Sequence, residues 1–237
     1  MTNTVNRFWH HADAKRNGKT WRAELPLLST DKPLWVYANV LYALDSPVSG
    51  AGYYYAPYTA NQFCLSTRMM IARPEQLKAA GVKVTDRPSL VIETFEAQWS
   101  KAWFTYDLTD NWARKTHKLY DPKWQAPVSA HLALDVRAAQ TNRLVVGLDS
   151  YAAEVLLKGG PEWQSVVLAP ADFRNAAGVG RTDWRGIQEL RLGAKETLRL
   201  KDGGQEKKLD LGADWQGAKP EFRNMRWVES QEGKTLR

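Results

Sequence analysis

The stretch HLALDVR at residues 131–137 is followed by RLVVGL at 143–148 and by AEVLLK at 153–158. Apolar and polar side chains alternate in the first run, and the other two runs are short, apolar and rich in Val and Leu. The residues between them include Gln-Thr-Asn and Asp-Ser, which favour turns. The segment is therefore predicted to form three consecutive β-strands joined by short connections.

Similar short apolar or alternating runs occur along most of the chain. They lie at residues 20–25, 34–44, 62–72, 89–95, 165–168, 187–192, 197–200, 207–211 and 222–228. The helical pattern fits one stretch well, residues 73–81, where Pro74 stands near the start and Gly81 follows the end. Many short strands with one short helix predict an all-β fold, as a β-sandwich or jelly roll.

A domain boundary is expected at residues 84–88, because the predicted helix ends just before it and a new apolar strand begins just after it. The first domain, residues 1–86, offers three or four strands. That is fewer than a self-standing immunoglobulin- or fibronectin-like sandwich has, so this β-rich domain is expected to be partial. The second domain, residues 87–237, has enough strands for a complete two-sheet jelly roll.

The composition excludes some partners. The chain carries 33 Lys and Arg against 26 Asp and Glu, and most of the excess precedes Pro88. Acidic residues interrupt the basic stretches, so nucleic-acid binding is not expected. No apolar run approaches the roughly 20 residues that span a bilayer, so no membrane partner is expected. An extracellular or periplasmic location would require a signal upstream of Met1.

The sequence lacks the common catalytic and metal-binding motifs. No G-x-S-x-G nucleophile turn is present, and the four histidines, His10, His11, His117 and His131, do not stand in a nucleophile context. The single cysteine, Cys64, lies in the run Phe63-Cys64-Leu65, which predicts a buried strand position. One Cys and scattered His do not supply a zinc site, and the Gly pairs do not precede helices that could hold a phosphate.

Carboxylates leave two further possibilities. Glu93 and Glu96 could form a glycosidase pair at the end of a strand, with Asp107 and Asp110 in the next loop. A structural Ca²⁺ site is the alternative, since carboxylates of a first and a last strand can hold a hard cation between them. For this site the predicted ligands are Glu93, Glu96 and Glu229.

The segment from residue 95 to residue 124 is the richest in aromatic side chains. A pyranose stacks its C–H face on an aromatic ring and hydrogen-bonds its hydroxyls to polar side chains, so this mixture favours sugar binding. The alternative is that these rings fill the core. The predicted ligand-binding residues are Trp103, Tyr106, Asp107, Trp112, Lys118, Tyr120, Asp121 and Trp124.

Two downstream runs resemble a known family. The patterns W-x-x-V-x-L-x-x-x-D-F at residues 163–173 and D-W-x-x-I-x-x-L-x-L at residues 183–192 are similar to the galactose-binding-like jelly rolls that serve as carbohydrate-binding modules. In that family the two tryptophans are structural. The resemblance therefore implies that Trp163 and Trp184 belong to the core.

The resemblance extends upstream and covers most of residues 7 to 228. The runs TWRAELPL at residues 20–27, PLWVYANV at 33–40 and GAGYYY at 50–55 are similar to the region after the catalytic domain in bacterial hydrolases of the dienelactone hydrolase and PhoPQ-activated pathogenicity-related type. In those proteins an α/β-hydrolase domain precedes β-domains. The nucleophile-bearing part is missing from this sequence, so no catalytic residue is transferred.

Three functions follow as hypotheses. The first is a non-catalytic carbohydrate-binding accessory module of a polysaccharide-directed hydrolase, with a polysaccharide or oligosaccharide as its partner. The second is a structural or interaction domain that packs on an α/β-hydrolase, with residues 53–58 as contact surface. The third is a jelly-roll glycosidase or polysaccharide lyase.

Overall fold

The computed structural model describes residues 9–51, 57–105 and 112–229, and the all-β, sandwich-like class is confirmed. The chain divides into two compact units, one of Met1–His11 with Arg87–Arg237 and one of Ala12–Asp86. We call them the sandwich unit and the ribbon unit. The division falls between residues 86 and 87, and the chain preceding residue 12 groups with the sandwich unit. None of the described helices is long and apolar enough to cross a membrane.

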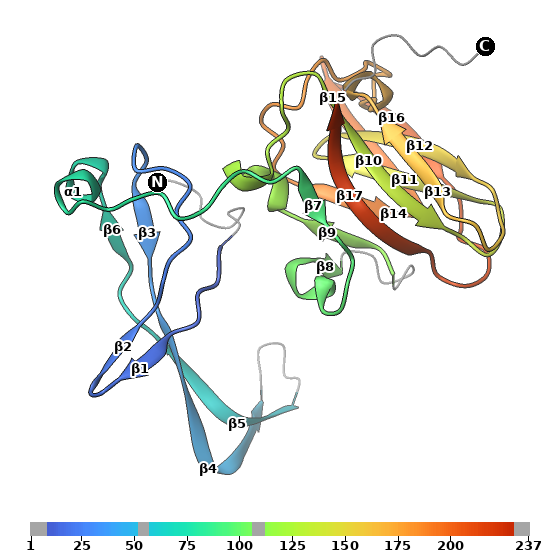
Figure 1. The fold of residues 1–237 in the computed structure, drawn as a ribbon. Coiled ribbons are helices and arrows are strands. Elements are labelled where there is room, and N and C mark those ends of the chain that lie inside the picture. The colour runs from blue at the N-terminus through green and yellow to red at the C-terminus, as the bar shows by residue number, and fades with distance from the viewer. Residues whose placement is uncertain (1–8, 52–56, 106–111, 230–237) are drawn as a thin grey trace. The chain divides into compact units, whose positions relative to one another are not determined.

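Two antiparallel sheets form the sandwich unit (Figure 1). The four-stranded sheet has the order β13 (Gln164–Leu168), β10 (Ala130–Arg137), β17 (Glu221–Glu229) and β7 (Val91–Glu93). The five-stranded sheet has the order β12 (Tyr151–Leu157), β11 (Asn142–Leu148), β14 (Leu190–Gly193), β9 (Arg114–Thr116) and β8 (Phe104–Thr105). Strands distant in sequence are therefore neighbours, as β7 and β17 show.

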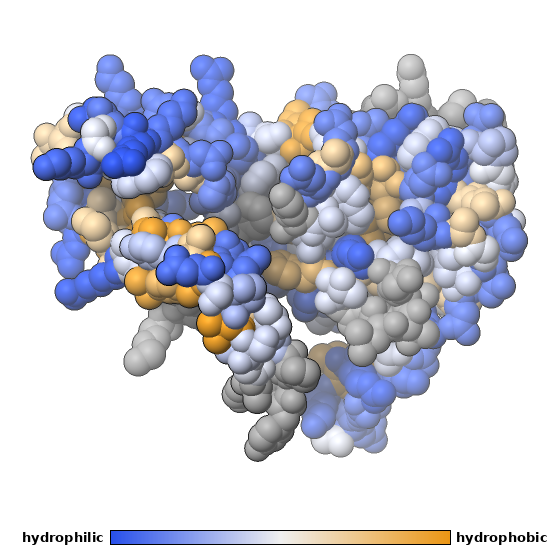
Figure 2. Space-filling view, turned by 90° about the horizontal axis from the view of Figure 1, so that it is seen from below, coloured by the Kyte–Doolittle hydropathy of each residue, from blue (hydrophilic) through white to orange (hydrophobic). Residues whose placement is uncertain are grey.

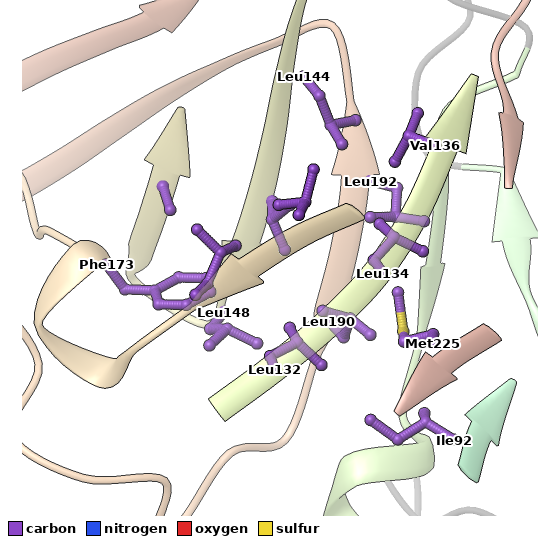
Figure 3. Packing of buried hydrophobic residues seen from close by; sticks show 14 of the residues in the cluster. Ile92, Leu132, Leu134, Val136, Leu144, Leu148, Phe173, Leu190, Leu192 and Met225 are labelled. Atoms are coloured by element: carbon purple, nitrogen blue, oxygen red, sulfur yellow. The ribbon is translucent and has the colours of Figure 1, made fainter. Parts of the chain in front are cut away.

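The core lies between these two sheets. Alternate residues of β10, Leu132, Leu134 and Val136, face alternate residues of β11 and β14, as Figure 3 shows for Leu144 and Leu192. Because successive strand side chains point to opposite faces, the period-two pattern of the sequence builds one apolar face on each sheet. Buried rings of Phe173 and Trp227 complete the cluster.

A hairpin of β15 (Lys195–Asp202) and β16 (Gln205–Gly212) packs on the other face of the five-stranded sheet. Leu198 of the hairpin forms a second buried cluster with Val145 of β11 and Ala152 of β12. The hairpin ends at Gly212, which has a φ of +78°, and a Cβ there would stand 1.9 Å from the carbonyl oxygen of Ala194. Only glycine fits this position.

Short 3-10 helices shape the loops of the sandwich unit. They are η2 (Trp99–Ala102), η3 (Lys118–Tyr120), η4 (Pro122–Trp124) and η5 (Pro170–Asp172). Three of the four, η2, η3 and η4, lie within the aromatic-rich segment of residues 95–124. Among the described residues of this segment, strands contribute only the short β8 and β9.

The ribbon unit consists of paired strands and one helix. Its strands are β1 (Lys15–Asn17), β2 (Thr20–Arg22), β3 (Leu34–Val36), β4 (Asn39–Ala51), β5 (Pro57–Ser66) and β6 (Met70–Ala72), and α1 is Pro74–Ala79. β1 pairs with β2. β3 pairs with β6, and β4 pairs with β5 in the continuation of the same two chain segments, so these four strands make one long two-stranded ribbon (Figure 1).

Burial in the ribbon unit is sparse. Among its described apolar residues, Leu27 and Leu77 are the buried ones. The prediction that Cys64 is buried is wrong, because Cys64 is exposed on β5. The strand was correctly located, but within the described chain no second layer covers this two-stranded ladder.

Candidate functional site

Two of the predicted stacking residues point into the core of the sandwich unit. Trp103 is 4% exposed and Trp112 is 9% exposed, and both belong to the main buried cluster. Trp103 packs edge to face on Trp99, and Trp112 packs in the same way on Trp215. Neither ring therefore offers a face to a sugar. Tyr106 and Asp107, also predicted ligand-binding residues, lie outside the described residues.

Lys118 is buried in an ion pair. Its Nζ lies 2.6 Å from Oε2 of Glu93 and donates to the carbonyl oxygen of Ile92 at 3.2 Å. Trp103 Nε1 donates to the same Oε2 at 3.0 Å, and the backbone N–H groups of Thr94 and Phe95 donate to Oε1. The Glu93 carboxylate thus accepts four hydrogen bonds, and Lys118 is held away from solvent.

Trp124 lies beneath other side chains. The ring of His10 stacks on it with centroids 5.5 Å apart and planes 10° apart, and the ammonium group of Lys118 lies 5.2 Å from its centroid. Asp121 accepts a hydrogen bond from His10 Nε2 at 2.9 Å and another from the backbone N–H of Lys123. These residues hold the N-terminal segment against η4.

Tyr120 is the predicted residue with the most open ring, at 39% exposure. Of the six described residues predicted to bind sugar, it alone is exposed. The others contact the core, each other or His10. The structure brings Lys118 and Trp124 together, and both Lys118 and Trp103 donate hydrogen bonds to Glu93. These contacts connect the residues to one another and to the core.

The three carboxylates predicted to bind calcium do not converge. Glu93 is opposite Met225 in the ladder, four residues before Glu229, so about 13 Å of strand separates the backbone position opposite Glu93 from that of Glu229. Glu96 is exposed in the loop after β7. Among the described residues, no group of three or more His, Cys, Asp and Glu side chains could hold a metal ion.

A cavity of about 510 Å³ opens among the loops of the sandwich unit. Its apolar lining includes Val128, Ile187 and Trp184, and its polar lining includes His131, Asp183 and Arg185. Trp184 is fixed by a 2.7 Å hydrogen bond from Nε1 to the carbonyl oxygen of Ala130, and its ring packs against Trp227. The cavity therefore has an aromatic wall held by a hydrogen bond, and the exposed polar groups of Asp183 and Arg185 lie at its rim.

The sequence contained one signal for this cavity that was interpreted differently. In the D-W-R-G run at residues 183–186, the resemblance implies a core position for Trp184 alone. Trp184 does pack against the core, but its neighbours Asp183 and Arg185 are exposed and line the cavity. Trp163, also expected in the core, lies half-buried outside the core clusters. The guanidinium carbons of Arg137 and Arg223 lie 4.9 Å and 4.2 Å from its centroid.

Two half-buried carboxylates of the sandwich unit, Asp135 and Glu189, have perturbed pKa values. Burial raises the pKa of Asp135, but the hydrogen bond from Asn224 and the charges of Arg226 and Arg223 outweigh it, so the pKa lies below its ordinary value. Burial likewise raises the pKa of Glu189, and hydrogen bonds from Arg191 and Lys115 outweigh it. Both groups are held ionised by cationic partners, as in structural ion pairs.

The ribbon carries an apolar face that is open to solvent. Val40 is opposite Leu65 and Tyr42 is opposite Phe63, so these four side chains share one face. Each is between 43% and 55% exposed, and Figure 2 shows hydrophobic residues at the surface of this unit. The rings of Tyr42 and Phe63 stack with centroids 5.0 Å apart. We call these four residues the ribbon face.

Comparison with known proteins adds no relationship. No family model, no curated protein and no solved structure matches the chain.

Proposed function

We propose that this chain is a non-catalytic accessory module that packs through its ribbon face on a larger protein domain, of the α/β-hydrolase type that the sequence resemblance implies. The ribbon face carries the proposal. It is an ordered set of large apolar side chains that remain open to solvent in a unit with little buried core of its own.

The physical argument concerns the stability of the ribbon. A two-stranded antiparallel ladder is marginally stable in water, and a third strand or a packed layer is needed to stabilise it. Successive side chains point to opposite faces, so Val40, Tyr42, Phe63 and Leu65 lie on one side of β4 and β5. Leu41 and Cys64 are paired on the other side. Burying a side chain of this size contributes about 1.5–3 kcal/mol, so covering all four would stabilise both the ribbon and the complex.

The binding test uses a recombinant α/β-hydrolase domain of the dienelactone hydrolase type as the partner. The double variant Tyr42→Lys/Phe63→Lys should abolish complex formation in calorimetry and size-exclusion chromatography, because two charges would have to be buried without partners. The matched control is Val128→Lys/Val179→Lys in the sandwich unit, which adds the same charge at exposed valines. Equal binding by the ribbon variant and the unchanged chain would contradict the proposal.

Carbohydrate binding by the sandwich unit is the second candidate, and the loop cavity favours it. A volume of about 510 Å³ accommodates one or two sugar residues, and the lining combines Trp184 with the polar groups of His131, Asp183 and Arg185. Such a mixture suits a ligand with an apolar face and directional hydroxyls. The cavity thus replaces the segment of residues 95–124 as the proposed position of the sugar.

Affinity electrophoresis on a panel of plant and algal polysaccharides separates the two positions. Asp183→Ala/Arg185→Ala should remove retardation if the cavity binds the sugar, and Tyr120→Ala should leave it unchanged. Loss of retardation with Tyr120→Ala but not with Asp183→Ala/Arg185→Ala would instead place the sugar at the loop around Tyr120. If no polysaccharide retards the unchanged chain, carbohydrate binding by the sandwich unit is rejected.

A further inference from the structure

The β1–β2 hairpin, KRNGKTWR at residues 15–22, concentrates positive charge. It contains four Lys and Arg residues and no Asp or Glu, and all eight residues are exposed. Its two-residue loop begins with Gly18 at a φ of +62°, which is the conformation of a type II′ hairpin turn. The turn therefore fixes how the flanking cations are displayed.

None of these four cations is neutralised by a described carboxylate. Elsewhere in the described chain cations are commonly paired, as in Lys78–Asp31, Arg137–Glu221 and Lys195–Asp214. Lys15, Arg16, Lys19 and Arg22 form no such ion pair. Four like charges within eight residues repel one another, so an anion that bridges them gains Coulomb energy that the folded chain itself does not supply.

The hairpin also displays an aromatic ring. Trp21 is 67% exposed and lies directly across the ladder from Arg16, so the two side chains share one face. Arg16 Nε donates to the carbonyl oxygen of Gly18 at 3.1 Å, which restrains the guanidinium group and leaves its terminal nitrogens unoccupied by described partners. Lys15 and Arg22 stand opposite each other on the other face. One open indole thus lies beside a fixed guanidinium and within a cationic cluster.

We propose that this hairpin is a binding site for an acidic polysaccharide, whose sugar ring stacks on Trp21 while its carboxylate or sulfate groups bind Arg16 and the neighbouring cations. The site shares no residue with the ribbon face or with the lining of the loop cavity, so it goes beyond the functions proposed above. An indole takes the C–H face of a pyranose, and a guanidinium group binds a planar carboxylate or a sulfate through two nitrogens.

A single ring and a short cationic cluster favour a sugar polymer over a nucleic acid. Single-stranded nucleic-acid sites use several rings for successive bases, along grooves that hold four or more nucleotides. The hairpin offers one ring over a ladder of three residue pairs. This footprint corresponds to one or two sugar residues with their charged groups.

The test uses the complete chain and four probes: heparin, polygalacturonate, neutral dextran and single-stranded poly-dT. Heparin and polygalacturonate distinguish sulfate from carboxylate as the bound group. We expect the chain to bind at least one of these two and not to bind dextran. The affinity should fall as the salt concentration rises, because binding releases counterions from the polyanion. Arg16→Gln/Arg22→Gln should weaken binding about 10-fold or more at low salt, and Trp21→Ala should weaken it about 5-fold with partial rescue by Trp21→Phe.

The control variant is Lys32→Gln/Lys83→Gln, which removes the same charge from exposed positions of the same unit outside the hairpin. It should change the affinity less than 2-fold, roughly the effect of screened charge at a distance. Equal weakening by this control would overturn the proposal in favour of non-specific attraction. Tighter binding of poly-dT than of either acidic polysaccharide, or no effect of Trp21→Ala, would overturn it as well.

Discussion

The buried ion pair of Lys118 and Glu93 gives the sharpest prediction for stability. Their side chains are 10% and 8% exposed, and Nζ and Oε2 are 2.6 Å apart. Replacing Lys118 with Met keeps most of the length of the side chain and removes its charge, which leaves the Glu93 carboxylate without its counter-ion. Removing one partner of a buried pair costs about 3–5 kcal/mol, so Lys118→Met should destabilise the sandwich unit by that amount.

The double variant Glu93→Gln/Lys118→Met should cost less than Lys118→Met alone. The Gln side-chain oxygen can still accept the hydrogen bond from Trp103 Nε1, and no unpaired charge is buried. The Gln NH2 group then faces the backbone N–H groups of Thr94 and Phe95, which lose their acceptor. We expect a loss of about 1–2 kcal/mol for the double variant, because replacing a whole buried pair is close to neutral. The two single changes are therefore strongly non-additive.

Urea unfolding, monitored by tryptophan fluorescence, measures these differences in the free energy of unfolding. With a slope of about 2 kcal/mol per molar urea, Lys118→Met should move the midpoint by about 1.5–2.5 M. Lys208→Met is the matched control, because its ion pair with Asp210 is exposed, and it should change stability by less than about 0.5 kcal/mol. A cost below about 1 kcal/mol for Lys118→Met, or additive single changes, would refute the reasoning.

Three further predictions concern the fold. Gly212→Ala should cost at least about 2 kcal/mol in thermal unfolding, since its Cβ meets backbone, whereas Gly203→Ala, with a positive φ but open space around it, should cost about 1 kcal/mol. Leu148→Ala, in the core at 0% exposure, should cost about 2–5 kcal/mol, whereas Tyr42→Ala on the ribbon face should change the stability of the uncomplexed chain by less than about 0.5 kcal/mol. The pKa of Glu189 is lowered in the folded state, so its contribution is complete above its unfolded pKa and is lost as the pH falls through the folded value. Glu189→Gln should therefore destabilise the protein at pH 7 and have a smaller effect at pH 3, and an equal effect at both pH values would contradict this assignment.

The strands of the sandwich could be predicted because their pattern is local. Residues 131–137, 143–148 and 153–158 were expected as strands, and the structure has Ala130–Arg137, Asn142–Leu148 and Tyr151–Leu157. A side-chain period of two is visible in a single strand and does not depend on its neighbours. The helix expected at residues 73–81 also has a local signal, since Pro74 stands near its start and Gly81 follows its end. The structure has it as α1, Pro74–Ala79.

The direction of the tryptophans could not be predicted, because it depends on partners distant in sequence. Trp103 is buried with its N–H satisfied by Glu93 of β7, and β7 pairs with β17, more than a hundred residues further along the chain. A loop rich in aromatic and polar residues has the same composition whether its rings face a sugar or a core. The burial of Cys64 was predicted from a valid strand pattern, but burial also requires a second layer over the strand.

The tryptophan pairs of the sandwich give the protein a built-in spectroscopic reporter. The ring centroids of Trp112 and Trp215 lie 4.9 Å apart, and those of Trp184 and Trp227 lie 5.0 Å apart. Electronic transitions of indoles at such distances couple, which splits their circular dichroism bands into components of opposite sign. Trp21 is 67% exposed, so dissolved iodide can quench its fluorescence. One sample can therefore report separately on loss of the sandwich core and on occupation of the β1–β2 hairpin.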